Sequence, residues 1–463
     1  MPRIGGQAVP KKLIILMMLD SVAILVSLCA AMYFRYSEVG WTISFDQSIL
    51  ARFGLVVLVC ELALYFNDLY LLEVVRRRSS LLVHLIHAVG FTCLILAFLY
   101  YLVPSLQLGR GVTLFAAPMI LVLILSWRLS LDASGLLARA SERVLIVGTG
   151  KMGVNLVREI MEHPEFNLKV VGFLDEKGEN IGKSLVNPGI VGGIADLEEI
   201  VSREKVDQVV LALTERRGTT PARALMRLKF SGVHVDDAHG LHEKLMGAIA
   251  IDNLSPSWLI LSEGFRKSPL LMAAKRLIDL LSASVILLLV WPVLLLAAMA
   301  IRLESRGPVF FRQTRVGLGG HPFEVLKFRS MRVNAEANGP QWATEDDKRV
   351  TRVGKFLRKY RLDEFPQLFN VLRGEMSLVG PRPERPEFTE MLEQEISFFG
   401  LRHTVRPGVT GWAQVKYPYG STTEDAKRKL ELDLFYIKHL AITLDLAIIF
   451  ETAKVVLLGR GSK

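Results

Sequence analysis

Residues Arg143–Gly153 read RVLIVGTGKMG, and this stretch determines the predicted fold of the middle part of the chain. Its apolar start, Arg143–Val147, predicts a short buried strand, and the G-x-G-x-x-G that follows opens a helical pattern. Strand, glycine turn and helix form the context in which this motif binds a dinucleotide, because the glycines permit a tight turn and the helix N-terminus can hold a phosphate. We therefore predict an α/β Rossmann-like domain, of the type that binds CoA or a dinucleotide, over residues 139–265.

The candidate nucleotide-binding residues of this domain are Gly148, Gly150, Gly153 and Asp175. A second predicted strand, Leu168–Leu174, ends at Asp175, and an acidic residue at this position suits a contact with a ribose hydroxyl. The alternative is that the glycines only let the helix pack closely on the strand. Further strands are predicted over Gly189–Val191, Asp207–Ala212 and Gly232–Val235.

Two features limit the function of the predicted Rossmann-like domain. A reductase or sugar dehydratase on this fold would need Tyr-x-x-x-Lys, and none of the ten Tyr residues has a Lys four positions later. Residues 139–265 hold 15 basic and 18 acidic side chains, a balance that disfavours nucleic acid as a partner. Redox catalysis and nucleic-acid binding are therefore not expected here.

The chain before the glycine motif is apolar. Four runs each approach the roughly 20 residues that a helix needs to cross a bilayer, which predicts a transmembrane bundle of four helices over residues 1–138. Lys and Arg flank the first run on its N-terminal side and the second and fourth on their C-terminal sides, so both ends of the bundle should be cytoplasmic. The runs are Leu13–Phe34, Ile49–Tyr70, Leu81–Pro104 and Val112–Leu131, and the flanking charges are Lys11, Lys12, Arg76, Arg77, Arg78, Arg139 and Arg143.

The positive charge of the protein lies at the other end of the chain. Its formal net charge is +10, and residues 266–463 hold 31 Lys and Arg against 21 Asp and Glu, whereas residues 1–265 are balanced. Such an excess suits anionic substrates and an anionic membrane surface. The three Cys residues all lie in apolar runs, so neither a disulfide framework nor a Cys-built metal site is expected.

A fifth apolar run, Leu277–Ile301, opens this basic part and is interrupted by Trp291-Pro292. Proline in a helix interior breaks or kinks the helix. Basic residues also lie on both flanks, including Lys275, Arg276 and Arg302, so the two ends should lie on the same side of the membrane. We predict a re-entrant membrane helix over about residues 277–301; a kinked helix that spans the bilayer is the alternative.

The adjacent carboxylates Asp363 and Glu364 lie among many cations, including Arg358, Arg361 and Arg373. Surrounding cations lower carboxylate pKa values and can bind phosphate, and Arg suits forked phosphate recognition. An ionised carboxylate can bind Mg²⁺ or act as a nucleophile. A solvated, salt-bridged helix face is the competing interpretation of such a pair.

Several motifs follow one another in this part of the chain, in order and at characteristic spacings. Together they resemble the bacterial sugar transferase family, the monotopic polyprenyl-phosphate glycosyl-1-phosphate transferases, from about Lys275 to the C-terminus. The whole layout also resembles the large members of the family, which carry four membrane helices and a Rossmann-like domain before the catalytic region. The motifs are PVFFRQTRVG (Pro308–Gly317), KFRSM (Lys327–Met331), LDEFPQLFNVL (Leu362–Leu372), GEMSLVGPRP (Gly374–Pro383) and VRPGVTGWAQ (Val405–Gln414).

The resemblance implies an α-rich monotopic phosphoglycosyl transferase domain over residues 266–463. It implies that Asp363 attacks the phosphate next to the sugar of a UDP-sugar, forms a covalent phosphosugar intermediate, and binds the cofactor Mg²⁺. Glu364 completes the catalytic dyad by assisting the acceptor or by holding the geometry. Arg358 and Arg382, and also Lys327 and Arg329, are the implied phosphate-binding residues. The family often has Ser at the position of Arg361, so one more cation lies near the dyad here.

The implied product is undecaprenyl-diphosphate-sugar, with release of UMP, in the first membrane step of exopolysaccharide or O-antigen synthesis. The implied partners are a UDP-sugar, undecaprenyl phosphate, membrane lipid, a second copy in a homodimer, and downstream polysaccharide glycosyltransferases. The expected location is the bacterial inner membrane, with the soluble domains in the cytoplasm. Two other readings stay open: a membrane-tethered nucleotide-sensing regulatory protein with an inactive transferase region, and a membrane sugar dehydratase, which the missing Tyr-x-x-x-Lys disfavours. Trp412 either stacks on uracil or packs in the domain.

Overall fold

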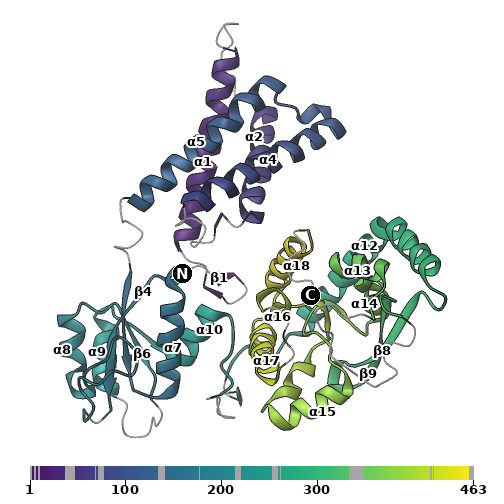
Figure 1. The fold of residues 1–463 in the computed structure, drawn as a ribbon. Coiled ribbons are helices and arrows are strands. Elements are labelled where there is room, and N and C mark those ends of the chain that lie inside the picture. The colour runs from purple at the N-terminus through teal and green to yellow at the C-terminus, as the bar shows by residue number, and fades with distance from the viewer. Residues whose placement is uncertain are drawn as a thin grey trace. The chain divides into compact units, whose positions relative to one another are not determined.

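The computed structural model describes residues 3–4, 7–8, 11–36, 47–67, 69–70, 78–133, 141–176, 178–213, 221–252, 259–260, 262–332, 349–417, 420 and 422–457. Most of the chain falls into two compact units, Ala8–Ala238 and His239–Lys463. The first unit holds a helical bundle and an α/β domain, and the second holds the motif-rich region (Figure 1). Near the N-terminus, β1 (Arg3–Ile4) and β2 (Gln7–Ala8) form a two-stranded sheet.

The four N-terminal apolar runs form four helices: α1 (Lys11–Tyr36), α2 (Gln47–Phe66), α4 (Arg78–Leu102) and α5 (Arg110–Ala133). They lie side by side, with α1 packed on α5 and α2 on α4 (Figure 1). By length and composition each could cross a membrane, and so could α12 (Pro269–Glu304) of the second unit. The flanking residues Arg76, Arg77 and Arg139 lie outside the described residues.

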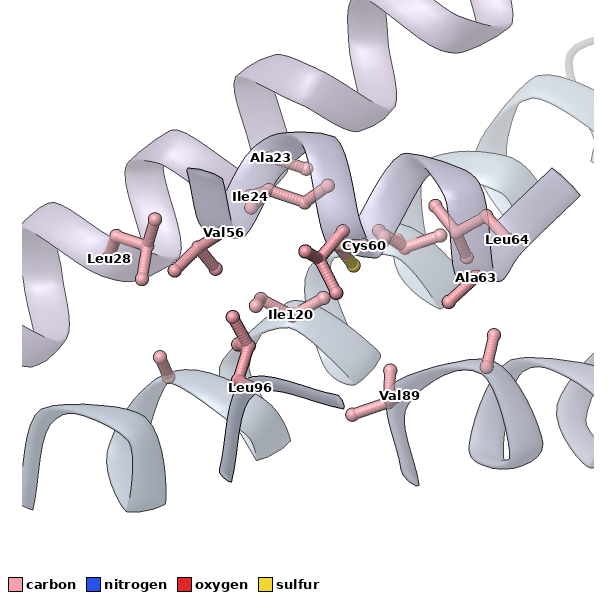
Figure 2. Packing of buried hydrophobic residues seen from close by; sticks show 14 of the residues in the cluster. Ala23, Ile24, Leu28, Val56, Cys60, Ala63, Leu64, Val89, Leu96 and Ile120 are labelled. Atoms are coloured by element: carbon pink, nitrogen blue, oxygen red, sulfur yellow. The ribbon is translucent and has the colours of Figure 1, made fainter. Parts of the chain in front are cut away.

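The interior of the bundle is mainly apolar, and its buried polar side chains among the described residues include Ser27, Thr92 and the ion pair of Asp20 with Arg128. Arg128 lies 2.5 Å from Asp20, and both side chains are fully buried. Arg128 also donates a hydrogen bond to the carbonyl oxygen of Leu69 at 2.6 Å. A charge can stay buried when a counter-ion and hydrogen bonds replace its water. Figure 2 shows how buried apolar side chains of the bundle pack, and it labels Ala23, Ile24, Leu28, Val56, Cys60, Ala63, Leu64, Val89, Leu96 and Ile120.

The predicted Rossmann-like domain is confirmed as a five-stranded parallel sheet with the order β5-β4-β3-β6-β7. The chain runs from the central β3 to β4 and β5 on one side and then to β6 and β7 on the other, so the strand order reverses at the β3–β6 junction. Ligands of such sheets bind outside the carboxyl ends of the strands at this junction. The elements are β3 (Glu142–Val147), α7 (Lys151–Glu162), β4 (Leu168–Asp175), β5 (Ile190–Gly193), α8 (Leu197–Arg203), β6 (Gln208–Leu211), α9 (Ala222–Phe230) and β7 (His234–Asp237), with single 3-10 turns at Pro164–Phe166 and Ile194–Asp196.

The second unit is built mainly of helices around short strands. The strands β8 (Phe310–Val316) and β9 (Pro322–Phe328) form an antiparallel pair, and β10 (Ser377–Val379) and β11 (Gly408–Thr410) a parallel pair. Around them lie α10 (Ala238–Met246), α12, α13 (Arg352–Lys359), η6 (Leu362–Glu364), α14 (Gln367–Arg373), α15 (Pro386–Glu395), η7 (Phe399–Thr404), α16 (Trp412–Lys416), α17 (Thr423–Lys438) and α18 (Ile442–Leu457).

Residues just before the expected start of the transferase domain pack with that domain. Ala248, Ile249 and Ile251 belong to its apolar core, and the amide of Ile249 donates to the carbonyl oxygen of Glu431 on α17 at 3.0 Å. The continuous stretch His239–Lys463 belongs to one compact unit. The domain boundary between residues 265 and 266 stays a prediction from the sequence.

Candidate active site

The carboxylate pair lies on a short turn between two helices. Asp363 and Glu364 form the turn η6 (Leu362–Glu364), between α13 and α14, and the turn packs against β9. Arg361 precedes it in the left-handed conformation, with φ of 53°. This conformation ends α13 sharply and turns the chain so that the two carboxylates follow at once.

Glu364 is the carboxylate of the pair that forms ion pairs with the surrounding cations. Its oxygens lie 2.7 Å from Arg382 Nη2, 3.4 Å from Lys327 Nζ and 3.7 Å from Arg361 Nη1, and its side chain is 12% exposed. Burial alone would raise the pKa of Glu364, but Arg382, Lys327 and Arg361 outweigh burial and hold this pKa well below its usual range. Glu364 is therefore ionised at neutral pH.

Asp363 differs from its neighbour in both contacts and ionisation. Among the described residues, none places a cationic nitrogen within 4 Å of its carboxylate. Burial, and then the negative charge of Glu364, raise the pKa of Asp363, although Lys327, Arg358 and Arg382 act in the opposite direction. One carboxylate is thus committed to organising cations, and the other is left for a ligand or a reacting group.

Three of the four predicted phosphate-binding residues act electrostatically on this pair. Arg382 and Lys327 bind Glu364 directly, and Arg358, in the last turn of α13, contributes to the ionisation of Asp363. Arg329 is engaged elsewhere, since its guanidinium donates to the carbonyl oxygens of Ser305 (2.8 Å) and Arg306 (3.1 Å) just after α12. The contacts of Arg329 therefore tie the end of α12 to β9.

Lys275 and Arg276 have contacts that the sequence did not reveal. Their place beside the apolar run predicts flanking charges on one side of the membrane. In the structure Lys275 is buried and lies 2.5 Å from Asp445, and its Nζ also donates to the carbonyl oxygen of Val379 at 3.1 Å. Arg276 donates to the last carbonyl oxygens of α14, Val371 (2.6 Å) and Leu372 (3.0 Å). These two cations therefore connect α12 to the segment from α14 to β10, which lies between the carboxylate pair and Arg382.

Asp279, one helical turn after Lys275, makes a third connection of α12 to this segment. Its carboxylate accepts hydrogen bonds from Ser377 Oγ (2.8 Å) and from the amide of Leu378 (3.1 Å). Both donors belong to the motif that continues to Arg382. Lys275 and Asp279 are four positions apart at the start of an apolar run, and this spacing was the signal for a buried polar face.

The glycine motif of the Rossmann-like domain is occupied by packing contacts. A Cβ at Gly148, where φ is +108°, would lie 2.7 Å from the carbonyl oxygen of Ala212 on the neighbouring β6 side, and one at Gly153 would lie 2.8 Å from the Ala212 Cβ. Gly150 is the N-cap of α7. Asp175 is buried and accepts from Thr149 Oγ1 (3.3 Å) and the amide of Glu179 (3.0 Å). Nucleotide binding by these four residues stays a prediction.

Trp412 packs in the domain, in agreement with the second of the two roles considered for it. The side chain is buried, and its Nε1 donates to the carbonyl oxygen of Gly247 at 2.7 Å. Its ring stacks on Phe435 at a centroid distance of 5.9 Å.

The donor set near the pair suits a metal that binds mainly through its substrate. Among the described residues, no group of three or more His, Cys, Asp and Glu side chains forms a metal site. Mg²⁺ commonly uses one or two carboxylates and takes its other ligands from water and substrate phosphates. The carboxylate of Asp363 fits this pattern.

Comparison with known proteins places these observations in a family. Residues 270–459 match the model of the bacterial sugar transferases, and residues 65–236 match that of a CoA-binding domain. The chain is 44% identical, over 52% of its length and 56% of the relative's, to a UDP-N-acetylgalactosamine-undecaprenyl-phosphate N-acetylgalactosaminephosphotransferase of Aeromonas hydrophila. It is 34% identical, over 67% of its length and 66% of the relative's, to a UDP-glucose:undecaprenyl-phosphate glucose-1-phosphate transferase of Xanthomonas campestris pv. campestris.

These alignments span less than two thirds of the length of the two relatives. The alignment covers a larger share of another relative, a UDP-glucose:undecaprenyl-phosphate glucose-1-phosphate transferase of Caulobacter vibrioides. The two are 45% identical over 38% of this chain and 67% of the relative. The family match coincides with the unit that carries Asp363 and Glu364. The chain belongs to the bacterial sugar transferase family.

Proposed function

We propose that this protein transfers a sugar 1-phosphate from a UDP-sugar to undecaprenyl phosphate, giving undecaprenyl-diphosphate-sugar and UMP. The proposed step is the first membrane step of exopolysaccharide or O-antigen synthesis. One observation supports the proposal above all: the two carboxylates of the dyad have different contacts. Glu364 forms ion pairs with three cations, whereas Asp363 has no cationic nitrogen within 4 Å among the described residues. The names of the relatives supply the substrates.

The proposed reaction has two displacements at one phosphorus atom. An Asp363 carboxylate oxygen attacks the phosphorus that bears the sugar, the bond from this phosphorus to the bridging oxygen breaks, and UMP leaves with the bonding electrons. An oxygen of undecaprenyl phosphate then attacks the same phosphorus and releases Asp363. Splitting one transfer into two displacements through a covalent intermediate is the usual benefit of a nucleophilic carboxylate.

The cations around the dyad have two roles in this proposal. Lys327 and Arg382 lie within ion-pair distance of Glu364, so the ionised Glu364 keeps them beside Asp363. They face the charge that spreads over the phosphoryl oxygens during transfer, which is the charge that such enzymes must stabilise. Asp363 is the residue that would hold Mg²⁺, which when bound neutralises charge on the diphosphate.

Ionisation of Asp363 predicts a pH dependence of the first displacement. Asp363 must be ionised to attack, and its pKa is raised by burial and by Glu364. Activity should therefore be present above this raised pKa and be lost as the pH falls through it, at a higher pH than for an ordinary Asp of pKa about 3.9. The measurement is UMP release in a single turnover without acceptor, as a function of pH. Without acceptor, the titration of the lipid phosphate does not contribute to the fall of activity at low pH, the acid limb of the profile.

A matched variant checks the assignment of that limb. Glu364→Gln removes the neighbouring negative charge, so the acid limb should move to lower pH, whatever happens to the maximal rate. A limb that stays in place or moves to higher pH would contradict the assignment to Asp363.

We further propose that α12 is re-entrant and that the soluble parts, the Rossmann-like domain and the transferase domain, face the cytoplasm of the bacterial inner membrane. Both ends of α12 pack on the same unit: Leu271 and Met272 pack against its main core, and Ile301 packs with Phe328 and Leu357. The middle of the helix, which is continuous through Pro292, exposes apolar side chains such as Leu288 and Leu289, at 73% and 72%. A straight spanning helix would separate its ends by the roughly 30 Å of the bilayer core.

Single cysteines test this topology. Leu270→Cys and Leu303→Cys lie near the two ends of α12 at exposed positions, and Leu102→Cys lies at the end of α4 expected on the periplasmic side. In a variant whose three native cysteines are replaced by Ala, an impermeant maleimide should label positions 270 and 303 from the cytoplasmic side only and position 102 from the periplasmic side only. Labelling of 270 and 303 from opposite sides would refute the re-entrant path.

The activity is tested by incubating the purified protein with Mg²⁺, undecaprenyl phosphate and each of a panel of radiolabelled UDP-sugars. We expect UMP release and a labelled lipid product with at least one UDP-sugar. No UMP release from any donor would exclude the transferase function and favour the nucleotide-sensing regulatory alternative. Loss of water from the bound sugar would instead indicate a dehydratase.

A further inference from the structure

The four successive carbonyl oxygens of Pro381–Glu384 each accept a hydrogen bond from a different donor. Two donors are backbone amides, Gly408 to Pro381 (2.9 Å) and Val316 to Glu384 (2.9 Å). The other two are guanidinium groups: Arg402 Nη2 donates to the carbonyl oxygen of Arg382 (2.9 Å), and Arg315 Nη1 donates to that of Pro383 (3.1 Å). This segment forms no helix or strand, so its backbone is fixed by these outside donors.

Arg402 is itself held by contacts with two other side chains, Asp433 and Phe399. The same Nη2 lies 2.8 Å from Asp433 on α17, and the side chains are 6% and 2% exposed. The guanidinium also lies over the ring of Phe399, 5.0 Å from its centroid. Burial raises the pKa of Asp433 to about 6, so this carboxylate is ionised at neutral pH and balances the charge of Arg402.

The residue whose backbone Arg402 holds is the one that reaches the dyad. Arg382 Nη2 lies 2.7 Å from Glu364 Oε1, the shortest of the three ion pairs of Glu364. A hydrogen bond to a residue's carbonyl limits rotation of its peptide plane, and so limits the direction in which its side chain leaves the backbone. A positional error of about 1 Å at a reacting centre can cost on the order of 100-fold in rate.

We propose that Arg402, with Asp433 as its counter-ion, is a positioning residue that sets the backbone of Arg382 and thereby aims its guanidinium at Glu364 and the donor diphosphate. Arg402 touches neither Asp363 nor Glu364 in any contact of the described residues, so it acts through Arg382. The inference rests on the proposed transferase function.

Arg402→Lys keeps the charge and removes the fork that serves Asp433 and Arg382 together. We expect kcat/KM for UMP release to fall by about 10- to 100-fold. In an Arg382→Ala background the same substitution should cost less than about 3-fold, because residues that act through one another are not additive. Equal losses in both backgrounds, with an active wild type, would overturn the inference and leave the transferase function standing.

Arg406→Lys is the matched control, since its Nε also donates to a loop carbonyl, that of Gly374 (2.9 Å), away from Arg382. It should change kcat/KM by less than about 3-fold, because sites that share no partner act independently and this contact does not involve Arg382 or the dyad. A loss as large as that of Arg402→Lys would mean that any loop contact matters equally, and would overturn the inference.

Hydrogen exchange supplies a readout that needs no activity. Asp433→Asn, nearly isosteric, loosens Arg402 without emptying its site and serves if Arg402→Lys does not fold. Either variant should speed exchange in peptides that cover residues 380–388, whereas Arg406→Lys should not. Unchanged exchange in the first two would refute the positioning role even if no donor released UMP, and an inactive wild type would count against the transferase function alone.

Discussion

Asp363→Asn should lower UMP release by at least about 1000-fold, because a carboxamide cannot replace a carboxylate nucleophile. The substitution keeps the size of the side chain, and Asp363 takes part in none of the close ion pairs of Glu364. Folding and the cation cluster should therefore survive. The measurement is UMP release with the best UDP-sugar, together with the intact mass of the protein after incubation with that donor without acceptor.

The wild type should gain the mass of a sugar phosphate in that experiment, and Asp363→Asn should not. Glu424→Gln removes an exposed carboxylate on α17, 83% accessible, and serves as the control that should leave UMP release unchanged. If Asp363→Asn kept full turnover, the covalent route through Asp363 would be excluded even though the transfer itself stood.

Lys275→Met should cost about 3–5 kcal/mol of unfolding free energy, the usual cost of removing one partner of a buried ion pair. Lys275 and Asp445 are 8% and 10% exposed at the side chain, so the substitution leaves Asp445 buried without its cation. It also removes a donor to Val379, in the segment that leads to Arg382. Denaturant unfolding in detergent, followed by intrinsic fluorescence, measures the loss.

Two further variants separate loss of a counter-ion from loss of contact. The double variant Lys275→Met with Asp445→Leu should recover most of the stability, since well-packed apolar groups can replace a buried pair. Arg312→Met breaks an exposed pair, in which Arg312 and Glu324 are 69% and 63% exposed, and should cost less than about 1 kcal/mol. A cost of Lys275→Met no larger than that of Arg312→Met would show that the buried pair does not stabilise the unit.

Local pattern was enough to predict much of the architecture. The runs of about 20 apolar residues coincide with α1, α2, α4 and α5, and the strand–glycine–helix stretch at Arg143–Gly153 begins the five-stranded parallel sheet. Apolar period and glycine turns are local properties, which is why they can be read along the chain. The same holds for the adjacency of Asp363 and Glu364, which fixes them on one turn.

The cations of the site were predicted as a group but not in their individual contacts. Lys327 and Arg329 are two residues apart, a spacing that puts side chains on the same face of a strand. However, β9 ends at Phe328, so Lys327 reaches Glu364 while Arg329 binds the residues after α12. Where a strand ends depends on what packs beside it, and the sequence pattern gave no sign of this.

The sequence by itself determined the apolar helices, the parallel sheet, the position of the carboxylate pair and the family. Tertiary structure alone decided which charges meet: Lys275 pairs with Asp445, 170 positions away, and Arg402 with Asp433, 31 positions away. A local pattern encodes burial and periodicity along one element. The strength of a charge pair depends on the distance and solvent exposure of two groups from different elements, and these are set only when the elements pack.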